Sequence, residues 1–269
     1  MIRIGLLAAG LLSGVVAAQG QPPRVLFVMS AADTLPLRHG KTYAGTGVFL
    51  GEFYLPYQAV TAAGYTVTFA TPQGRVSPID QESLNARYWH GKDSTRTQAQ
   101  QFVTQDPAFR NPISLEEALH RANEFVGMVV PGGQGLMVDL RQNPTVPLLL
   151  RHFADHQKPL GLVCHAPALL LTLPRENHPF GGYTVNCVSG FEEFYIETFV
   201  MRGRPLNRHI ARQLKQAGLI YRHGRPGKPF GMRDRMLITS QNPFSNVLFS
   251  EQYLTALRQY IPRPLVNAR

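Results

Sequence analysis

The stretch Pro159-Leu160-Gly161-Leu162-Val163-Cys164-His165-Ala166-Pro167-Ala168-Leu169-Leu170-Leu171 decides the fold of this chain. A short apolar run with strand character ends at Cys164, and an alanine- and leucine-rich segment with helix character follows at once. A cysteine at such a junction lies on a sharp turn, which exposes its sulfur above the sheet edge. Because the following helix begins there, we expect its N-terminus to stabilise negative charge and to lower the thiol pKa.

Two interpretations of Cys164 are open from this stretch alone. Free cysteine is among the most buried residue types, so Cys164 can be a structural residue of the core. The adjacent His165 and a nearby glycine-rich loop favour a nucleophile. The second cysteine, Cys187, could form a disulfide with Cys164 in an oxidising compartment. Since a nucleophile must stay free, we favour two free thiols.

Outward from this stretch, strand patterns and helix patterns alternate along the chain. The apolar runs at 24–30, 65–70, 125–130, 183–188 and 235–239 predict strands. Helices are predicted at 47–64, from 114 onward, and at 148–156, 209–217 and 244–260, whereas 31–46 reads as a flexible loop and 76–113 as an irregular insertion. This alternation predicts an α/β fold in which helices cover both faces of a mostly parallel sheet, a three-layer sandwich.

The strand ends predict the place of the functional site. Pro131-Gly132-Gly133, Cys164 and Gln241-Asn242 each follow a predicted strand. Ligands of such sheets bind beyond the carboxyl ends of the strands, so we expect one pocket to collect these residues. No His, Cys, Asp and Glu cluster has a convincing metal-ligand spacing, and we expect neither a metal nor an organic cofactor.

The N-terminal segment has the pattern of a secretory signal peptide. Arg3 precedes a short uncharged run rich in Leu, Ala and Gly, and small residues lead to Ala18. We expect cleavage after residue 18, a periplasmic or secreted protein, and one α/β domain over 19–269. An uncleaved anchor is the alternative, although the apolar run is short for a membrane span.

The formal net charge of +10 is concentrated between residues 202 and 235. Such a region could attract nucleic acid, anionic lipid or an acidic partner. Aromatic interleaving and known nucleic-acid motifs are lacking, so we favour a solvated basic face and expect no nucleic-acid partner. The basic residues are Arg202, Arg204, Arg208, Arg212, Lys215, Arg222, Arg225, Lys228, Arg233 and Arg235.

Several motifs, in this order along the chain, resemble the ThiJ/PfpI superfamily of flavodoxin-like α/β proteins, which is related to class I glutamine amidotransferases. Within it, the first-helix motif and the chain length are most similar to the branch of heat-shock chaperones and glutathione-independent glyoxalases III. The resemblance implies a homodimer as well as the fold. The matching motifs are Thr46-Gly47-Val48-Phe49-Leu50-Gly51-Glu52, Ala70-Thr71-Pro72-Gln73-Gly74, Pro131-Gly132-Gly133-Gln134-Gly135, Val163-Cys164-His165-Ala166-Pro167 and Ser240-Gln241-Asn242-Pro243.

The resemblance also implies the roles of individual residues. Cys164 corresponds to the nucleophile and His165 to the base. Glu193 is the expected acidic partner of His165, with Glu192 as the alternative, and Glu52 corresponds to the first-helix carboxylate.

Chemistry follows from these parts. A thiolate at Cys164 can add to an aldehyde, and the N–H groups of Gly133 and His165 are placed to bind the resulting oxyanion. If Glu52 is buried near the sulfur, its pKa should be raised, and it can shuttle a proton. We therefore expect cofactor-free conversion of methylglyoxal, a small carbonyl substrate, to lactate.

Two other function classes compete. One is a holdase-type chaperone for unfolded protein clients, with Phe49, Phe53, Tyr54 and Tyr57 lining a surface. The other is an amidase or peptidase that uses the same nucleophile.

Overall fold

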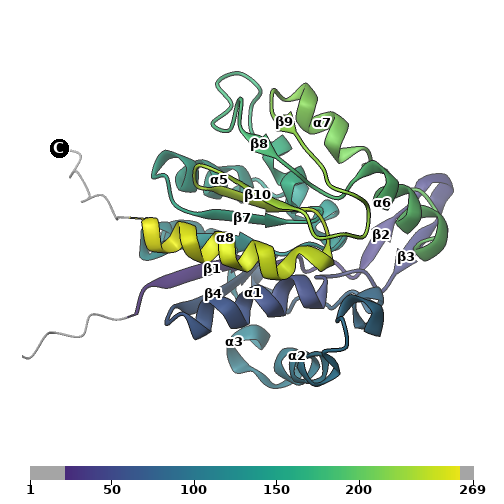
Figure 1. The fold of residues 1–269 in the computed structure, drawn as a ribbon, viewed down its shortest axis with the longest axis horizontal. Helices are drawn as coiled ribbons and strands as arrows, with labels where there is room; N and C mark the ends of the chain where they lie inside the picture. The colour runs from purple at the N-terminus through teal and green to yellow at the C-terminus, as the bar shows by residue number, and fades with distance from the viewer. Residues whose placement is uncertain (1–21, 261–269) are drawn as a thin grey trace, which may run out of the picture.

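The computed structural model describes residues 22–260. Its centre is a seven-stranded sheet with the strand order β10-β11-β7-β6-β1-β4-β5 (Figure 1). All neighbouring strands run parallel except β10, which pairs with β11 in the antiparallel sense. The expected signal peptide, residues 1–18, lies outside the described residues. The strands are β1 Arg24–Val28, β4 Thr66–Thr71, β5 Ile113–Ser114, β6 Phe125–Val130, β7 Leu160–Val163, β10 Gly231–Asp234 and β11 Leu237–Ser240.

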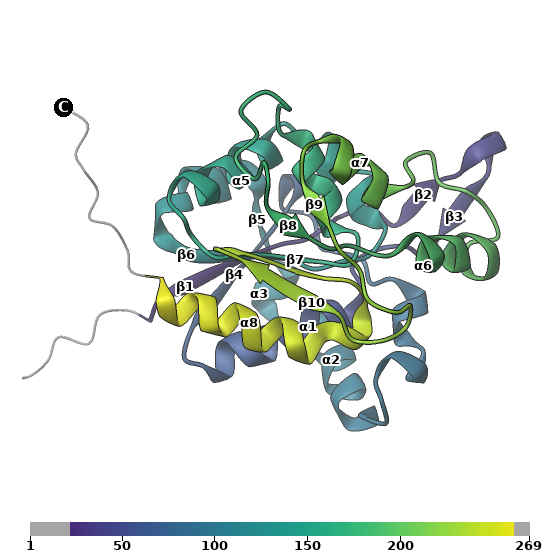
Figure 2. The same ribbon diagram turned by 45° about the horizontal axis from the view of Figure 1, so that its top comes forward.

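Helices cover both faces of this sheet. On one face α1 and α8 lie side by side, with α2 packed on α1, and α5 and α7 lie on the other face (Figure 2). Because both faces are covered, the central strands are continuous apolar runs, and Val25, Leu26 and Phe27 of β1 are fully buried. The helices are α1 Leu50–Ala62, α2 Asp93–Gln105, α3 Pro107–Arg110, α4 Leu115–His120, α5 Thr145–Asp155, α6 Gly190–Tyr195, α7 Ile210–Gln216 and α8 Asn246–Gln259.

The predicted α/β three-layer fold is confirmed, and the local signals explain many element boundaries. Gly64 and Gly218 have positive φ values just beyond α1 and α7, which ends these helices as the sequence predicts. At the start of α4, the Ser114 hydroxyl accepts a hydrogen bond from the backbone N–H of Glu117. No helix among residues 22–260 is both long and apolar enough to cross a membrane.

Small elements outside the main sheet account for most of the differences from expectation. The segment 31–46, expected to be a loop, contains an antiparallel hairpin of β2 (Thr34–Pro36) and β3 (Thr42–Ala44). The strand expected at 183–188 is only β8 (Thr184–Val185), which pairs with β9 (Ile220–Tyr221) outside the main sheet. Segment 76–113 holds the 13-residue helix α2. A strand of two or three residues is stable only when it pairs with another segment. The local residue pattern therefore does not predict such strands.

The aromatic residues of α1 belong to the core. Phe53 is fully buried and Tyr54 nearly so, while Tyr57 stacks on Phe53 with ring centroids 5.9 Å apart. Rings from β1, β4, α2 and α3 complete this cluster. Phe53 and Tyr54 therefore do not line the expected client-binding surface, because the apolar side of the helix packs against the sheet, whereas Phe49, just before α1, lines a cavity.

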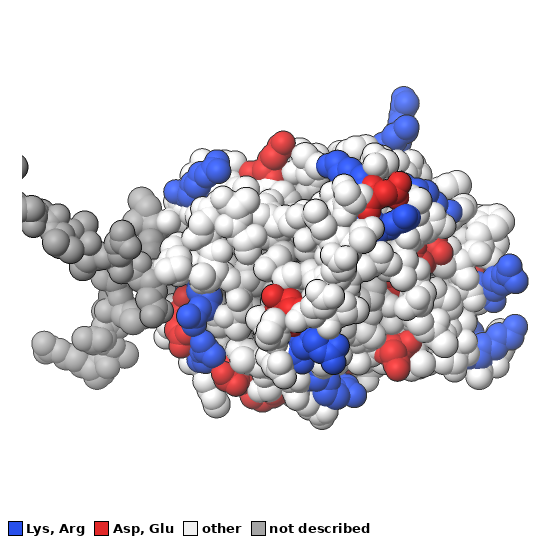
Figure 3. Space-filling view, turned by 90° about the horizontal axis from the view of Figure 1, so that it is seen from below, with Lys and Arg blue, Asp and Glu red and all other residues white. Residues whose placement is uncertain are grey.

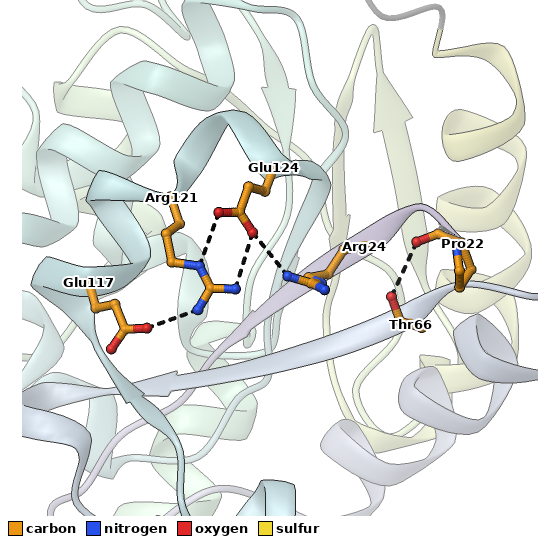
Figure 4. Close-up of polar contacts among 6 residues, drawn as sticks. All are labelled: Pro22, Arg24, Thr66, Glu117, Arg121 and Glu124. Carbon is orange, nitrogen blue, oxygen red and sulfur yellow. Dashed lines mark hydrogen bonds and ion pairs between the residues drawn. The ribbon is translucent and has the colours of Figure 1, made fainter. Parts of the chain in front are cut away.

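The amino-terminal end of the sheet, opposite the expected site, is held by polar contacts (Figure 4). Arg24 at the start of β1 donates a 2.9 Å hydrogen bond to Glu124, just before β6. Arg121 binds the same carboxylate and also Glu117 of α4. These exposed contacts connect the entry points of adjacent strands, and each contributes about 0–1 kcal/mol to stability.

The basic residues of 202–235 do not form one patch on one element. They lie before and on α7, on the loop between β9 and β10, and on or beside β10. Two are paired locally, since Arg208 binds Glu197, and Arg235 binds Asp234 while stacking 3.4 Å from the centre of the Tyr183 ring. On the side of the molecule away from α7, seen from below in Figure 3, basic and acidic side chains are also interspersed over an otherwise uncharged surface.

Candidate active site

Cys164 lies where β7 ends, on a turn with a left-handed backbone. Its φ is +59°, a conformation that costs a residue other than glycine roughly 1–3 kcal/mol. The turn is held by two neighbours, because Cys164 N–H donates to the Ser240 carbonyl at 2.7 Å and Val188 N–H donates to the Cys164 carbonyl at 2.9 Å. The predicted strand-to-helix turn is present, followed by the 3-10 helix Ala166–Thr172.

The Cys164 sulfur meets an imidazole on one side. Sγ lies 3.2 Å from Nδ1 of His165, whose side chain is 4 % exposed. Burial lowers the pKa of His165 to about 4, so its ring is neutral at pH 7. In the tautomer protonated at Nε2, Nδ1 can accept the thiol proton.

A buried carboxyl group faces the sulfur from α1. Glu52 is fully buried, and burial, with smaller contributions from Asp80 and Glu192, raises its pKa to about 8. The Cys164 thiol is a polar neighbour of this carboxyl, but neither Glu52 oxygen completes a well-formed hydrogen bond within residues 22–260. Glu52 is therefore a protonated acid at pH 7 beside the sulfur, as the sequence predicts for a buried carboxyl.

The lack of a side chain at Gly132 allows the Glu52 carboxyl to lie close to the Cys164 side chain. A Cβ atom at position 132 would lie 2.1 Å from Oε2 of Glu52 and 2.6 Å from Cβ of Cys164. Any larger residue would push the carboxyl away from the sulfur. The next residue, Gly133, has a φ of +107°. The backbone N–H groups of Gly133 and His165 make no hydrogen bond among the described residues, so both can donate to a ligand.

The thiol pKa differs in direction from the sequence prediction. Burial raises the pKa of Cys164 well above its ordinary value, and the Glu52 and Glu192 carboxyls raise it further. The expected lowering by a helix N-terminus is wrong, because only a short 3-10 helix follows and the surroundings carry acidic groups. Cys164 is consequently a thiol at pH 7 and requires a base before it can attack.

The two adjacent glutamates of α6 point to different surroundings. Ser189 caps α6, and the Glu192 side chain returns to the Ser189 N–H, which completes a capping box. The Glu192 carboxylate also accepts hydrogen bonds from Gly227 N–H, Gln241 Nε2 and Asn242 Nδ2 at 2.8–3.0 Å. This carboxylate lines the same cavity as Cys164.

Glu193 faces the opposite way. It is 7 % exposed, accepts a 3.4 Å hydrogen bond from Ile210 N–H of α7, and burial raises its pKa to about 7. The structure does not bring Glu193 to His165, and neither glutamate hydrogen-bonds His165 within residues 22–260. Glu192 lines a cavity that contains Cys164, whereas Glu193 lines neither of the two cavities at Cys164.

Both cysteines are free. Cys187 is fully buried, its Sγ lies 3.3 Å from the Val188 carbonyl oxygen, and it lines neither cavity that contains Cys164. No cluster of three or more His, Cys, Asp and Glu side chains suited to a metal ion occurs in the described part of the chain.

Two cavities meet at Cys164. The smaller, about 80 Å³, contains the polar side chains of Glu52, Asp80, Gln134 and His165 beside the apolar side chains of Phe49, Val200 and Met201. The larger, about 310 Å³, is lined mainly by apolar groups, and Arg87, Tyr88, Phe191 and Tyr195 contribute to it. The sequence does not indicate these four residues, because no motif near them connects them with Cys164.

The sequence does contain a signal for the position of Glu192. The pattern Ser189-x-x-Glu192 is that of a capping box, which predicts that the Glu192 side chain turns back to the start of α6.

Comparison with known proteins finds relatives in sequence and structures with a similar fold. The protein/nucleic acid deglycase HchA of Escherichia coli O7:K1 is 24 % identical over 226 residues, which cover 82 % of this chain and 76 % of that protein. The structure of glyoxalase III from Candida albicans superposes with a TM-score of 0.70 at 20 % identity, covering 87 % of this chain and 96 % of the other. The 24 kDa rapid encystment protein of Francisella tularensis gives a TM-score of 0.72 at 22 % identity, with coverages of 87 % and 98 %.

The family comparison covers the core of the site. A model described as "ThiJ/PfpI family-like" matches residues 43–188, more than half of the chain. This range includes Glu52, Gly133, Cys164 and His165. The chain therefore belongs to the ThiJ/PfpI-like family.

Proposed function

We propose that this protein is a cofactor-free, cysteine-dependent enzyme that acts on reactive 2-oxoaldehydes and converts methylglyoxal to lactate. The observation that carries the proposal is the placement of Cys164 Sγ at two cavities, 3.2 Å from His165 Nδ1 and beside the protonated Glu52. Similarity to proteins named deglycase and glyoxalase III supports carbonyl chemistry of this type.

The first step is addition of Cys164 to the aldehyde. His165 takes the thiol proton at Nδ1 while the sulfur bonds to the aldehyde carbon, and the carbonyl oxygen becomes an oxyanion. The free N–H groups of Gly133 and His165 border the smaller cavity and stabilise this oxyanion. His165 then returns the proton to the oxyanion, which gives a neutral hemithioacetal. In the next step this hydroxyl group loses its proton as the thioester carbonyl forms, and the ketone oxygen gains one.

The second step moves hydrogen between the two carbons. A base removes the proton from the former aldehyde carbon, and a proton is delivered to the former ketone carbon, so that an enzyme thioester of lactate forms. Water then hydrolyses the thioester and restores the thiol. His165 and Glu52 are the groups that exchange these protons. The aldehyde carbon is oxidised and the ketone carbon reduced, so the net reaction is addition of water.

Glu192 is proposed to position the site. Its carboxylate is held by five donors, and its charge raises the pKa of the neighbouring His165 against the effect of burial. This contribution favours protonation of His165 as the thiol proton arrives. We also propose export, from the N-terminal pattern alone, and a homodimer, from the resemblance alone.

The test is lactate formation from methylglyoxal by the purified protein without glutathione. Wild-type and Cys187→Ser proteins should form lactate, whereas Cys164→Ser should not. Lactate formation by Cys164→Ser at the wild-type rate would remove the proposal. Turnover of amide or peptide substrates with an acyl-enzyme burst, without lactate formation, would assign the hydrolase alternative.

A further inference from the structure

We infer that the preferred substrates are 2-oxoaldehydes with a bulky aromatic or branched apolar substituent, and that they react better than methylglyoxal. This inference rests on the proposed function and concerns the part of the substrate that does not react. It comes from the division of the space around Cys164 into a small cavity that holds Glu52 and His165 and a larger cavity walled mainly by rings, which share Tyr88, Cys164, Ile196 and Pro243.

The smaller cavity suits the reacting dicarbonyl group, because it holds the groups that exchange protons. It measures about 80 Å³ and presents Glu52, His165 and the Gly133 backbone. A molecule as small as methylglyoxal carries only a methyl group beyond its dicarbonyl. Such a substrate fills the smaller cavity almost by itself, and the larger apolar cavity contributes little to its binding.

The apolar cavity is larger than methylglyoxal requires. Its volume of about 310 Å³ lies at the lower end of the range of roughly 300–1,000 Å³ found for sites that bind drug-sized ligands. Its walls are mostly rings and aliphatic groups, on which an aryl substituent can stack. The aromatic and aliphatic residues of these walls include Tyr88, Val188, Phe191, Tyr195, Ile196 and Phe244.

Phe191 is the most informative of these residues. Its side chain on α6 is 62 % exposed although it borders the cavity. A large ring left in water at a cavity mouth gains most when an apolar ligand covers it. An aryl substituent therefore adds binding free energy that is available in the transition state as well as the ground state, which raises kcat/KM.

The experiment compares initial rates for phenylglyoxal and methylglyoxal, measured as mandelate and lactate. Phenylglyoxal takes up water to become mandelate by the same hydrogen transfer, without a redox partner. We expect kcat/KM to be about tenfold higher for phenylglyoxal. Phe191→Ala should lower kcat/KM for phenylglyoxal about fivefold more than for methylglyoxal. The matched control Phe194→Ala lies on the same helix and is 53 % exposed but outside both cavities. Because its ring centroid is 6.5 Å from that of Phe191, this variant should change each value by less than about twofold.

The outcomes separate this inference from the proposed function. Turnover of both substrates with equal kcat/KM, or equal effects of Phe191→Ala and Phe194→Ala, would overturn the inference and leave the proposed function standing. Failure to turn over either substrate would overturn the proposed function. Calorimetric titration with mandelate then tests whether the larger apolar cavity binds an aryl group, independently of turnover. Mandelate should bind more weakly to Phe191→Ala than to Phe194→Ala. Equal binding to both variants would contradict the inference.

Discussion

The two cysteines provide an internal comparison of chemically equal groups in different surroundings. Both are free and buried, and burial raises the pKa of both thiols well above the ordinary value. Cys164 lines two cavities and meets His165 and Glu52, whereas Cys187 lies beside Tyr221 and Glu193 and lines neither cavity. Burial and pKa therefore do not separate the two cysteines. Access to a cavity and a neighbouring imidazole do, and they are the reason why Cys164 is the proposed nucleophile.

The largest expected difference between the two cysteines is in activity. Cys164→Ala should lower kcat for methylglyoxal by about 10³-fold or more, because no other group in the pocket replaces the nucleophile. Cys187→Ala should retain activity within about twofold, since Cys187 lines neither cavity. Steady-state lactate formation measures both variants. Comparable losses of activity in the two variants would contradict the proposal that Cys164, and not Cys187, is the nucleophile.

The second prediction concerns pH and the acid beside Cys164. The folded-state pKa of Glu52 is raised from 4.5 to about 8, so the folded chain keeps a proton that the unfolded chain releases. The corresponding stability is fully present below pH 4.5 and is lost as the pH rises through 8, by a few kcal/mol at most. Glu52→Gln should remove the part of this pH-dependent loss of stability that comes from the Glu52 carboxyl.

Urea unfolding at several pH values between 4 and 9 measures the effect. The exposed Glu251 supplies the control variant, Glu251→Gln, which should follow the wild-type profile. A Glu52→Gln profile that falls as steeply as the wild type would show that Glu52 does not hold the proton.

The third prediction compares Glu192, which lines a cavity with Cys164, and Glu193, which lies near Cys187. Glu192→Gln puts an amide where five donors converge, so at least one donor loses its acceptor and the pocket wall shifts. We expect kcat/KM to fall about tenfold or more. Glu193→Gln should keep kcat/KM within about twofold, because Glu193 faces α7. The reverse order in a kinetic comparison would restore Glu193 as the partner of His165.

The smallest expected effect concerns stability at Cys187. Cys187→Ala removes a fully buried sulfur from close packing, which should lower the free energy of unfolding by about 1 kcal/mol. Cys164→Ala should cost less, because Cys164 borders open cavities and its sulfur makes fewer packing contacts. Denaturant melts of the two variants at one pH provide the measurement. Greater destabilisation by Cys164→Ala would contradict this view of the packing.

Much of the fold was predictable because long apolar patterns carry their own structural information. The strands around Phe27 and Val129 and the helices closed by Gly64 and Gly218 follow from periodicity and terminal glycines. The hairpin of β2 and β3 and the strand β10 were not predicted, because their stability depends on pairing and contacts distant in the chain. In the site, Cys164, His165, Glu52 and Gly133 could be proposed from motifs, whereas the aromatic wall could not.

The sequence by itself determined the α/β order and the turn that presents Cys164, because both depend on local patterns of apolar and small residues. Only the tertiary structure decided the direction of the thiol pKa, since that direction depends on burial and on carboxyls from other elements. It also decided which glutamate lines the pocket. Neighbouring residues on a helix point about 100° apart, so Glu192 and Glu193, equivalent in sequence, have different surroundings once α6 packs.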